Sequence, residues 1–230
     1  MTIKKIILTS SLIMLLVSIF SSCEYDNYEE PKSRLYGKIV YQGEPINVGF
    51  NDVTFELWEP GWQKSIPINV VVAPDGTYSA LLFDSTYKLT IPLSQGPFKS
   101  KTDTITVNLK GNKELDIEVE PYYMIRNQDF TVSGNTITAS FGLEKIITGD
   151  EARDIEKVYL YVNKTQFVDL QSNMGRSELS GSDIENLSSI TLSTPIPNLI
   201  VKQNYLFVRI GVKISHVEDF LYSPVQKINL

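Results

Sequence analysis

Short stretches in which apolar and polar residues alternate recur along most of this chain. Gly, Pro or Asn-Asp pairs interrupt them at intervals of roughly 8 to 12 residues, a spacing typical of antiparallel β-sandwiches and barrels. After Cys23, no stretch keeps apolar residues at the helical period for three turns. The pattern therefore predicts an all-β protein.

The predicted strands fall into two sets, and Pro121 lies between them. The first set comprises Arg34–Tyr41, Val53–Trp58, Ile66–Val72, Thr77–Phe83, Tyr87–Ile91, Thr104–Leu109 and Leu115–Val119. The second comprises Met124–Val132, Thr136–Phe141, Val158–Val162, Ser189–Leu192, Tyr205–Ile214 and Phe220–Ile228. We therefore expect two antiparallel β-sandwich domains in tandem, over residues 34–120 and 121–230.

Turn and loop signals separate several of these strands. Pro74-Asp75-Gly76 and Ser133-Gly134-Asn135 each predict a tight hairpin, because Asn, Asp and Gly tolerate the left-handed backbone that short turns need. Residues 149–156 and 171–186 are polar and are predicted to be loops, the first of which could hold one helical turn.

The first 23 residues have a different character. Lys4 and Lys5 precede an apolar run, Ile6–Phe20, which Ser21-Ser22-Cys23 follows. This run is shorter than the ~20 residues that a transmembrane helix needs, so residues 1–22 are predicted to be a cleaved export signal. Cys23, the only cysteine, then becomes the lipidated first residue of a bacterial lipoprotein, anchored to a membrane through its acyl chains. The alternative is a free thiol in a secreted protein that is cleaved elsewhere.

Residues 23–33 are predicted to be an acidic tether behind the lipidated cysteine. The stretch Glu24–Pro31 resembles the acidic signal that sends Bacteroidetes lipoproteins to the outer face of the outer membrane. An ordinary solvated linker explains the same composition equally well.

The charge of the mature chain excludes one class of partner. Residues 1–22 contain two lysines and no acidic residue, so 19 basic and 27 acidic side chains remain, a net charge of −8. Nucleic-acid binding needs a basic surface, so no nucleic-acid partner is expected. With a single cysteine, no disulfide within the chain can stabilise the fold, and each domain must bury a sufficient apolar core.

Several motifs resemble known families. The first domain resembles the transthyretin-like, carboxypeptidase-regulatory type of sandwich through Leu35–Tyr41, Gly43-Glu44-Pro45-Ile46, Val53–Leu57 and Asp75–Tyr78. The second resembles a fibronectin-III-like sandwich through Asn204–Gly211 and Tyr222–Val225. A closer resemblance is to a Bacteroidetes family of unknown function, carried by Glu56–Trp62, Leu82-Phe83-Asp84, Tyr87-Lys88-Leu89 and Gly96-Pro97-Phe98. Its members are surface lipoproteins encoded beside SusC/SusD-type glycan importers, which the resemblance implies as partners.

Candidates for catalysis and metal binding are few. The chain has one histidine, His216, and no nucleophile elbow, so neither a Ser-His-Asp triad nor a zinc site is expected. Glu56 and Glu59 could supply the two carboxylates of a glycosidase, although solvated edge positions explain both. The acidic residues between 150 and 156 could bind calcium, but their spacing is not that of an EF-hand, and a solvated loop is favoured. No cofactor is expected.

Aromatic residues near turns suggest a binding site instead. Trp58 and Trp62, the only tryptophans, flank Pro60-Gly61, and Phe98 lies on another turn. An exposed aromatic face stacks on the C–H groups of a sugar ring, so these three residues are candidates for binding an extracellular glycan. The alternative is ordinary packing, with Trp58 in the core and Trp62 capping the sandwich.

The sequence thus favours a non-catalytic outer-membrane lipoprotein that binds glycan or assists a SusC/SusD-type importer. A fimbrillin-like structural subunit is the alternative, since such subunits are also lipoprotein precursors with two transthyretin-like sandwiches. A pilin needs an open edge strand, and Pro195, Pro197 and Val201-Lys202 would obstruct one candidate edge. A carboxylate-based glycan-active enzyme is the third possibility.

Overall fold

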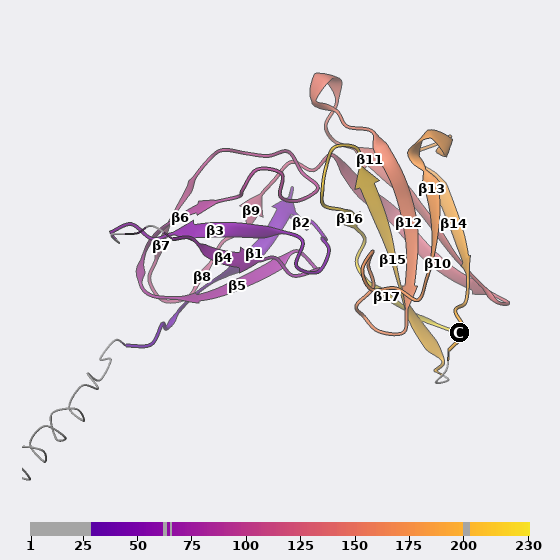
Figure 1. Ribbon diagram of the computed structural model, residues 1–230, viewed down its shortest axis with the longest axis horizontal. Coiled ribbons are helices and arrows are strands. Elements are labelled where there is room, and N and C mark those ends of the chain that lie inside the picture. Colours follow the sequence, from indigo (N-terminus) through magenta and orange to yellow (C-terminus); the bar gives the residue numbers. More distant parts are fainter. Residues whose placement is uncertain (1–28, 62–63, 65, 200–202) are drawn as a thin grey trace, which may run out of the picture. The chain divides into compact units, whose positions relative to one another are not determined.

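The structure is a computed structural model that describes residues 29–61, 64, 66–199 and 203–230. Lys32–Leu230 forms one compact unit (Figure 1). The expected signal peptide, Cys23 and Trp62 lie outside the described residues. Within the described part, no helix has the length and apolar character needed to cross a membrane.

The first domain contains two sheets. Its strands are β1 (Ser33–Tyr41), β2 (Glu44–Pro45), β3 (Thr54–Trp58), β4 (Ile68–Val71), β5 (Thr77–Leu82), β6 (Ser85–Thr90), β7 (Ile105–Leu109), β8 (Lys113–Glu114) and β9 (Ile117–Glu118). One sheet has the order β4-β3-β6-β7, and in the other β2, β5, β8 and β9 all pair with β1. The pairings of β8 and β9 with β1 are parallel, a short departure from the expected antiparallel pattern.

The second domain also contains two sheets. Its strands are β10 (Tyr123–Ser133), β11 (Thr136–Lys145), β12 (Ile155–Asn163), β13 (Gly175–Ser180), β14 (Ile190–Pro195), β15 (Tyr205–Ile214), β16 (Leu221–Tyr222) and β17 (Gln226–Asn229). One sheet has the order β10-β11-β14, and the other has the order β13-β12-β15-β16, with β17 also on β15. Two short 3₁₀ turns, η1 (Gly149–Glu151) and η2 (Gly181–Asp183), are the helical elements of the described residues. The prediction of tandem all-β domains is confirmed.

The period-2 alternation explains which face of each strand is buried. In β15, Leu206, Val208 and Ile210 lie on the core face with no exposed surface, and the side chain of Arg209 leaves the opposite face. Burying each such aliphatic side chain stabilises the fold by about 1.5 to 3 kcal/mol. The outer face of this sheet is therefore available to carry other chemistry.

Some predicted elements were wrong in detail. β13 falls in a stretch expected to be a loop, and the expected strand Phe220–Ile228 is two strands, β16 and β17, because Pro224 between them has no N–H for the ladder. The turn at Pro74-Asp75-Gly76 forms, with Gly76 at φ 82°, but it joins β4 and β5, which belong to different sheets. The hairpin at Gly134 and the helical turn after Thr148 are confirmed.

The predicted obstructed edge is a real sheet edge. β14 pairs with β11 alone in its sheet, and the strand ends at Pro195. Val201 and Lys202 lie outside the described residues.

Candidate functional site

The predicted aromatic platform does not assemble in the described residues. Phe98 is 3% exposed, and its backbone forms a β-bridge with Pro121, so the ring has no open face for a sugar. Trp58 is half-buried at the end of β3, where its indole N–H donates to the Glu56 carboxylate (3.0 Å) and to Thr90 Oγ1 (3.2 Å). Trp62, the third predicted residue, falls outside the described part of the chain.

Trp58 is also not the core residue that one alternative expected. Phe55 and Leu57 occupy the core face of β3 with no exposed surface, so the alternation places Glu56 and Trp58 on the outer face. The hydrogen bond from the Trp58 indole holds the Glu56 side chain in place, so this carboxylate has a structural role. Glu56 and Trp58 therefore belong to a packed outer surface of the first domain.

Two other aromatic rings are exposed side by side. Phe50 lies in the loop between β2 and β3, and Phe167 lies in the loop between β12 and β13. Their side chains are 52% and 54% exposed. The ring centroids are 6.0 Å apart and the planes make an angle of 78°, an edge-to-face contact between the two domains. We call these residues the Phe50–Phe167 pair.

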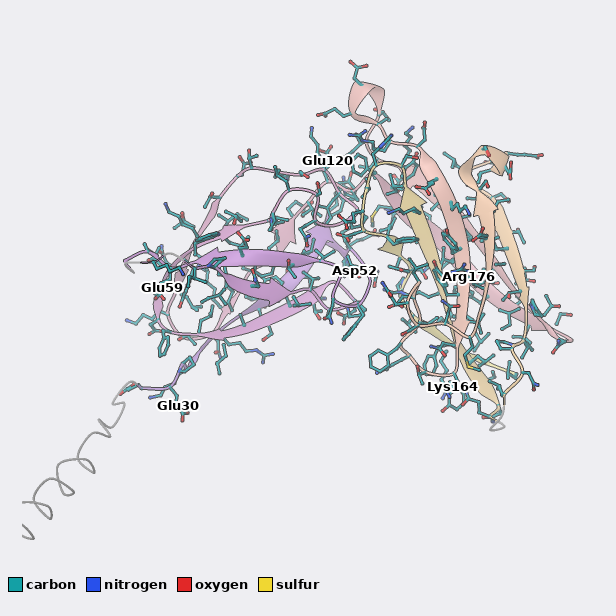
Figure 2. All side chains as sticks on the ribbon, in the orientation of Figure 1. Glu30, Asp52, Glu59, Glu120, Lys164 and Arg176 are labelled. Carbon is teal, nitrogen blue, oxygen red and sulfur yellow. The ribbon has the colours of Figure 1, made fainter. Side chains whose placement is uncertain are left out.

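The loop that carries Phe50 is tightly turned. Asn51, the next residue, adopts a left-handed conformation with φ 61°, and the Asp52 N–H donates to the Gly49 carbonyl at 3.4 Å. Gly49 leaves room for the Asp52 side chain, because a Cβ at Gly49 would lie 1.8 Å from Asp52 Oδ2. The turn therefore folds the Asp52 side chain back against Gly49 and leaves Phe50 exposed (Asp52 is labelled in Figure 2).

The loop that carries Phe167 is held by side-chain hydrogen bonds to its backbone. Asn163 Nδ2 donates to the carbonyls of Phe167 (2.6 Å) and Ser172 (3.2 Å). Asp169 Oδ1 accepts hydrogen bonds from the N–H groups of Gln171 (2.9 Å) and Ser172 (2.8 Å). These bonds fix the loop conformation, so the exposed ring of Phe167 is pre-organised.

The side chain of a buried arginine, Arg209, lies near the Phe50–Phe167 pair and hydrogen-bonds to both domains. Arg209 is 2% exposed, and its Nη2 donates to the carbonyls of Val48 (3.0 Å) and Pro74 (2.8 Å) in the first domain. Its Nε donates to the Ser223 carbonyl (2.8 Å) in the second. The guanidinium also lies 4.3 Å from the centroid of the Tyr222 ring. Burial lowers the pKa of Arg209 to about 10, which leaves it charged at neutral pH.

Aromatic packing supports this region from the second domain. Tyr159, Tyr161, Phe220 and Tyr222 form a buried layer on the outer face of the sheet that contains β12 and β15. Tyr159 stacks on Tyr161, with centroids 5.3 Å apart, and Phe220 stacks on Tyr222, with centroids 5.7 Å apart. The Tyr222 N–H also donates to the Asn47 carbonyl at 3.0 Å. A backbone hydrogen bond therefore joins this aromatic layer to the loop that contains Asn47.

Three adjoining pockets lie along this contact between the domains. The loop pocket, about 740 Å³, is lined by Phe50, Asn51, Asp52, Thr165, Phe167 and Asp169. The central pocket, about 520 Å³, shares Phe50 and Phe167 with it and adds Asn47, Asp75, Phe207 and Pro224. The bulge pocket, about 670 Å³, shares Asn47, Asp75 and Pro224 with the central one and adds Arg126, Asn127 and Gln128. We call the three pockets together the groove.

Carboxylates near the Phe50–Phe167 pair differ in what they contact. Asp169 is 5% exposed and is engaged by its own loop, and Asp219, 8% exposed, accepts a hydrogen bond from the Gly96 N–H at 2.6 Å. Asp52 makes no side-chain hydrogen bond within the described residues. Burial, with smaller contributions from Asp219 and Asp169, raises the pKa of the Asp52 carboxyl above its ordinary value. Of these three carboxylates, Asp52 is therefore the one that accepts no hydrogen bond within the described residues.

The raised pKa of Asp52 predicts a pH-dependent stability. Its charged form is less favourable in the folded chain than in the unfolded one, so this residue costs stability as the pH rises from 3.8 through the raised pKa. Asp52→Asn cannot ionise and should therefore melt at a higher temperature than the unmodified chain at pH 7, with the difference disappearing below the ordinary Asp range. Melting temperatures across this pH window test the prediction, and a difference independent of pH would contradict it.

Two of the acidic candidates between residues 150 and 156 form ion pairs at the surface. Glu151, in η1, forms an ion pair with Lys99, and Asp154 lies 3.8 Å from Lys145 Nζ. Among the described residues, no group of three or more His, Cys, Asp or Glu side chains is placed to hold a metal ion. His216 lies exposed in a turn after β15, at φ 59°.

Comparisons with known proteins establish the family. Residues 33–120 match the model described as "Protein of unknown function (DUF3823) N-terminal domain", and residues 123–227 match "Domain of unknown function (DUF3823_C)". A solved DUF3823 protein from Parabacteroides merdae is 38% identical, with a TM-score of 0.78, covering 87% of this chain and 100% of its own. The chain belongs to the DUF3823 family. No curated protein shows significant similarity to it.

Other solved structures extend the comparison. One from Bacteroides ovatus is 32% identical, with a TM-score of 0.79, and covers 86% of this chain and 100% of its own. A protein from Bacteroides uniformis described as a "putative carbohydrate binding protein" is 21% identical, with a TM-score of 0.68 and coverage of 87% and 100%, and shares the fold. The relatives' solved chains correspond to the compact unit, so Lys32–Leu230 is expected to fold by itself.

The sequence contained weak signals for the groove of this DUF3823 protein. Phe50 follows Gly49 and precedes Asn51-Asp52, and Phe167 follows the polar stretch Asn163–Gln166 and precedes Val168-Asp169. An aromatic residue among turn-forming residues indicates a ring in a surface loop. Their pairing has no local signal, because the contact joins two domains.

Proposed function

We propose that this DUF3823 protein is a non-catalytic glycan-binding protein whose site is the Phe50–Phe167 pair and the pockets beside it. The observation that carries the proposal is the exposure of two adjacent phenylalanine rings on loops that are held by their own hydrogen bonds. Exposed apolar patches on a protein surface often mark binding sites, and a pyranose ring presents C–H groups that pack on an aromatic face.

Polar groups around the rings suit the hydroxyls of a sugar. Asn51, Thr165 and Gln166 are exposed beside the pair, and their side chains make no hydrogen bond within the described residues. Amides and hydroxyls both donate and accept, as a sugar hydroxyl does. The relative described as a carbohydrate binding protein supports the same class of ligand.

The contacts of the nearby carboxylates favour glycan binding without hydrolysis. A glycosidase of the usual type needs two carboxyl groups free to act as acid and as base or nucleophile. Asp75, Asp169 and Asp219 each accept a hydrogen bond from a backbone N–H group. Asp52 is the carboxylate beside the rings that accepts none within the described residues. The proposal therefore assigns Asp52 to hydrogen bonding with the ligand.

Location and partners form a further part of the proposal. The pattern of residues 1–23 supports an acylated Cys23 that anchors the protein to the outer membrane, facing the exterior. The resemblance of the first domain to a Bacteroidetes lipoprotein family supports a role beside a SusC/SusD-type importer. The motifs of the first domain support the transthyretin-like assignment, and Asn204–Gly211 and Tyr222–Val225 in the second domain support the fibronectin-III-like assignment. An anchored glycan-binding module would hold polysaccharide close to the importer.

Phe167→Ala is expected to weaken glycan binding by about 1 to 3 kcal/mol, the scale of one lost aromatic contact. A glycan array with Lys32–Leu230 identifies the ligand, and calorimetry on the purified ligand measures the change. The melting temperature should stay nearly constant, because the ring is 54% exposed. Phe83→Ala is the matched control, since Phe83 is 47% exposed and lines none of the three pockets. Equal affinities of both variants and the unmodified chain would refute the site.

A further inference from the structure

We propose that the groove takes an extended, uncharged oligosaccharide rather than a single sugar, and that Asn127 and Gln128 form a second subsite away from the Phe50–Phe167 pair. This inference rests on the glycan-binding function proposed above. The three pockets adjoin through shared residues, from Asp52 at one end to Gln128 at the other. Each lies in the range of about 300 to 1,000 Å³ that suits one small ligand, so together they provide room for several sugar units.

The second subsite is built on a bulge. The pairing of β10 with β11 shifts register between Arg126 and Asp129, which leaves Asn127 and Gln128 out of the ladder. Asn127 adopts a left-handed conformation with φ 49°, which is uncommon for a residue other than glycine. Bulges of this kind turn side chains out of a sheet, and they are frequent beside binding sites.

The two amides are free to bind. Asn127 is exposed and Gln128 is half-buried, and neither side chain makes a hydrogen bond within the described residues. Arg126, which precedes them, is fixed by hydrogen bonds to the carboxylates of Glu44 and Glu144. Each amide offers donors and an acceptor that can pair with vicinal hydroxyls. The bulge is thus held on one side and presents unpaired polar groups into the pocket.

The charges of the groove favour an uncharged ligand. Arg126 is paired with two carboxylates, and Arg209 is buried and engaged by three backbone carbonyls. Lys227 lies over the Tyr205 ring, with Nζ 3.8 Å from its centroid. At the other end, Asp52 adds a carboxylate without a hydrogen-bond partner among the described residues. Lys38 also lines the bulge pocket. The side chains that line the three pockets thus carry four positive and four negative charges, so the groove has no excess charge of either sign to attract a uronate or sulfate group, and neutral sugars are the expected class.

Affinity should therefore depend on chain length. Neutral oligosaccharides of increasing length, from the monosaccharide upward, in the malto, cello, xylo and manno series, are titrated into Lys32–Leu230 by calorimetry. In the series that binds, affinity is expected to rise with length and then level off. The double variant Asn127→Ala/Gln128→Ala should lose about tenfold in affinity for the longest members and leave the shortest binding member unchanged. Phe167→Ala should weaken every member.

Controls separate this inference from the proposed function. Asn112→Ala removes an exposed amide that lines none of the three pockets and should change nothing. Affinity independent of length, equal losses at all lengths in the double variant, or tighter binding of uronate oligosaccharides would overturn the extended neutral ligand while leaving glycan binding intact. Absence of binding in every series, or an unaltered affinity in Phe167→Ala, would instead overturn the proposed function and this inference with it.

Discussion

Arg209→Met should lower the free energy of unfolding of Lys32–Leu230 by about 3 kcal/mol, because three backbone carbonyls lose their donor inside the protein. Met keeps much of the side-chain volume, so the loss reports the hydrogen bonds more than packing. The carbonyls of Val48 and Pro74 belong to the first domain and that of Ser223 to the second. The two domains should therefore come apart more easily, and glycan affinity should fall with stability.

Denaturant unfolding measures the effect of Arg209→Met. Arg176→Met is the matched control, because Arg176 is exposed on β13 (labelled in Figure 2) and its side chain makes no hydrogen bond among the described residues. Its substitution should alter stability by less than about 0.5 kcal/mol. Equal midpoints for the two variants would show that the guanidinium contributes nothing net, as happens when desolvation cancels the gain from hydrogen bonding.

Gly37→Ala should destabilise the first domain by about 3 kcal/mol, the upper range for an overpacked site. A Cβ at Gly37 would lie 2.0 Å from the Leu115 carbonyl oxygen and 2.6 Å from its carbon. The backbone there cannot easily move, because the Leu115 N–H donates to the Tyr36 carbonyl (2.8 Å) and the Lys38 N–H donates to Asp116 Oδ1 (2.9 Å). The parallel pairing of β8 and β9 with β1 therefore depends on this glycine.

Gly175→Ala provides the comparison for Gly37→Ala. Gly175 also lies in a strand, β13, but the nearest atom that a Cβ there would meet is a Pro197 side-chain carbon at 3.2 Å. This substitution should be nearly neutral, since Ala loses less backbone entropy than Gly on folding. If both variants unfold at the same denaturant concentration, the close approach of the Leu115 carbonyl does not explain why glycine stands at position 37.

The alternation of apolar and polar residues predicted most strands, because a strand with one face in a core has an apolar residue at every second position. β15 agrees with the expected range, since five aliphatic residues alternate with polar or aromatic ones along it. β13 was missed because Gly175–Ser180 is a polar edge strand without a strong alternation. The turn at Gly76 was recognised but its strands were assigned to one hairpin, since local turn chemistry does not determine which sheet a strand joins.

The candidate site was less predictable than the fold. Turn composition drew attention to Trp58 and Phe98, yet the hydrogen bond to Glu56 and the burial of the Phe98 ring depend on tertiary contacts. Phe50 and Phe167 lie in different domains, and contacts between the domains, such as the hydrogen bonds from Arg209 and Tyr222 to first-domain carbonyls, bring them together. A sequence indicates exposed rings one at a time, whereas a site between domains arises from contacts far apart in the chain.

A crystal structure of Lys32–Leu230 with the tightest-binding oligosaccharide would show directly whether glycan binds at the Phe50–Phe167 pair. We expect a pyranose ring packed on this pair, with a hydroxyl within hydrogen-bond distance of Asp52 and further sugar units that follow the groove toward Asn127. A saccharide bound elsewhere, for example on the outer face of β3 at Trp58, with the two phenylalanine rings still exposed to solvent, would contradict it.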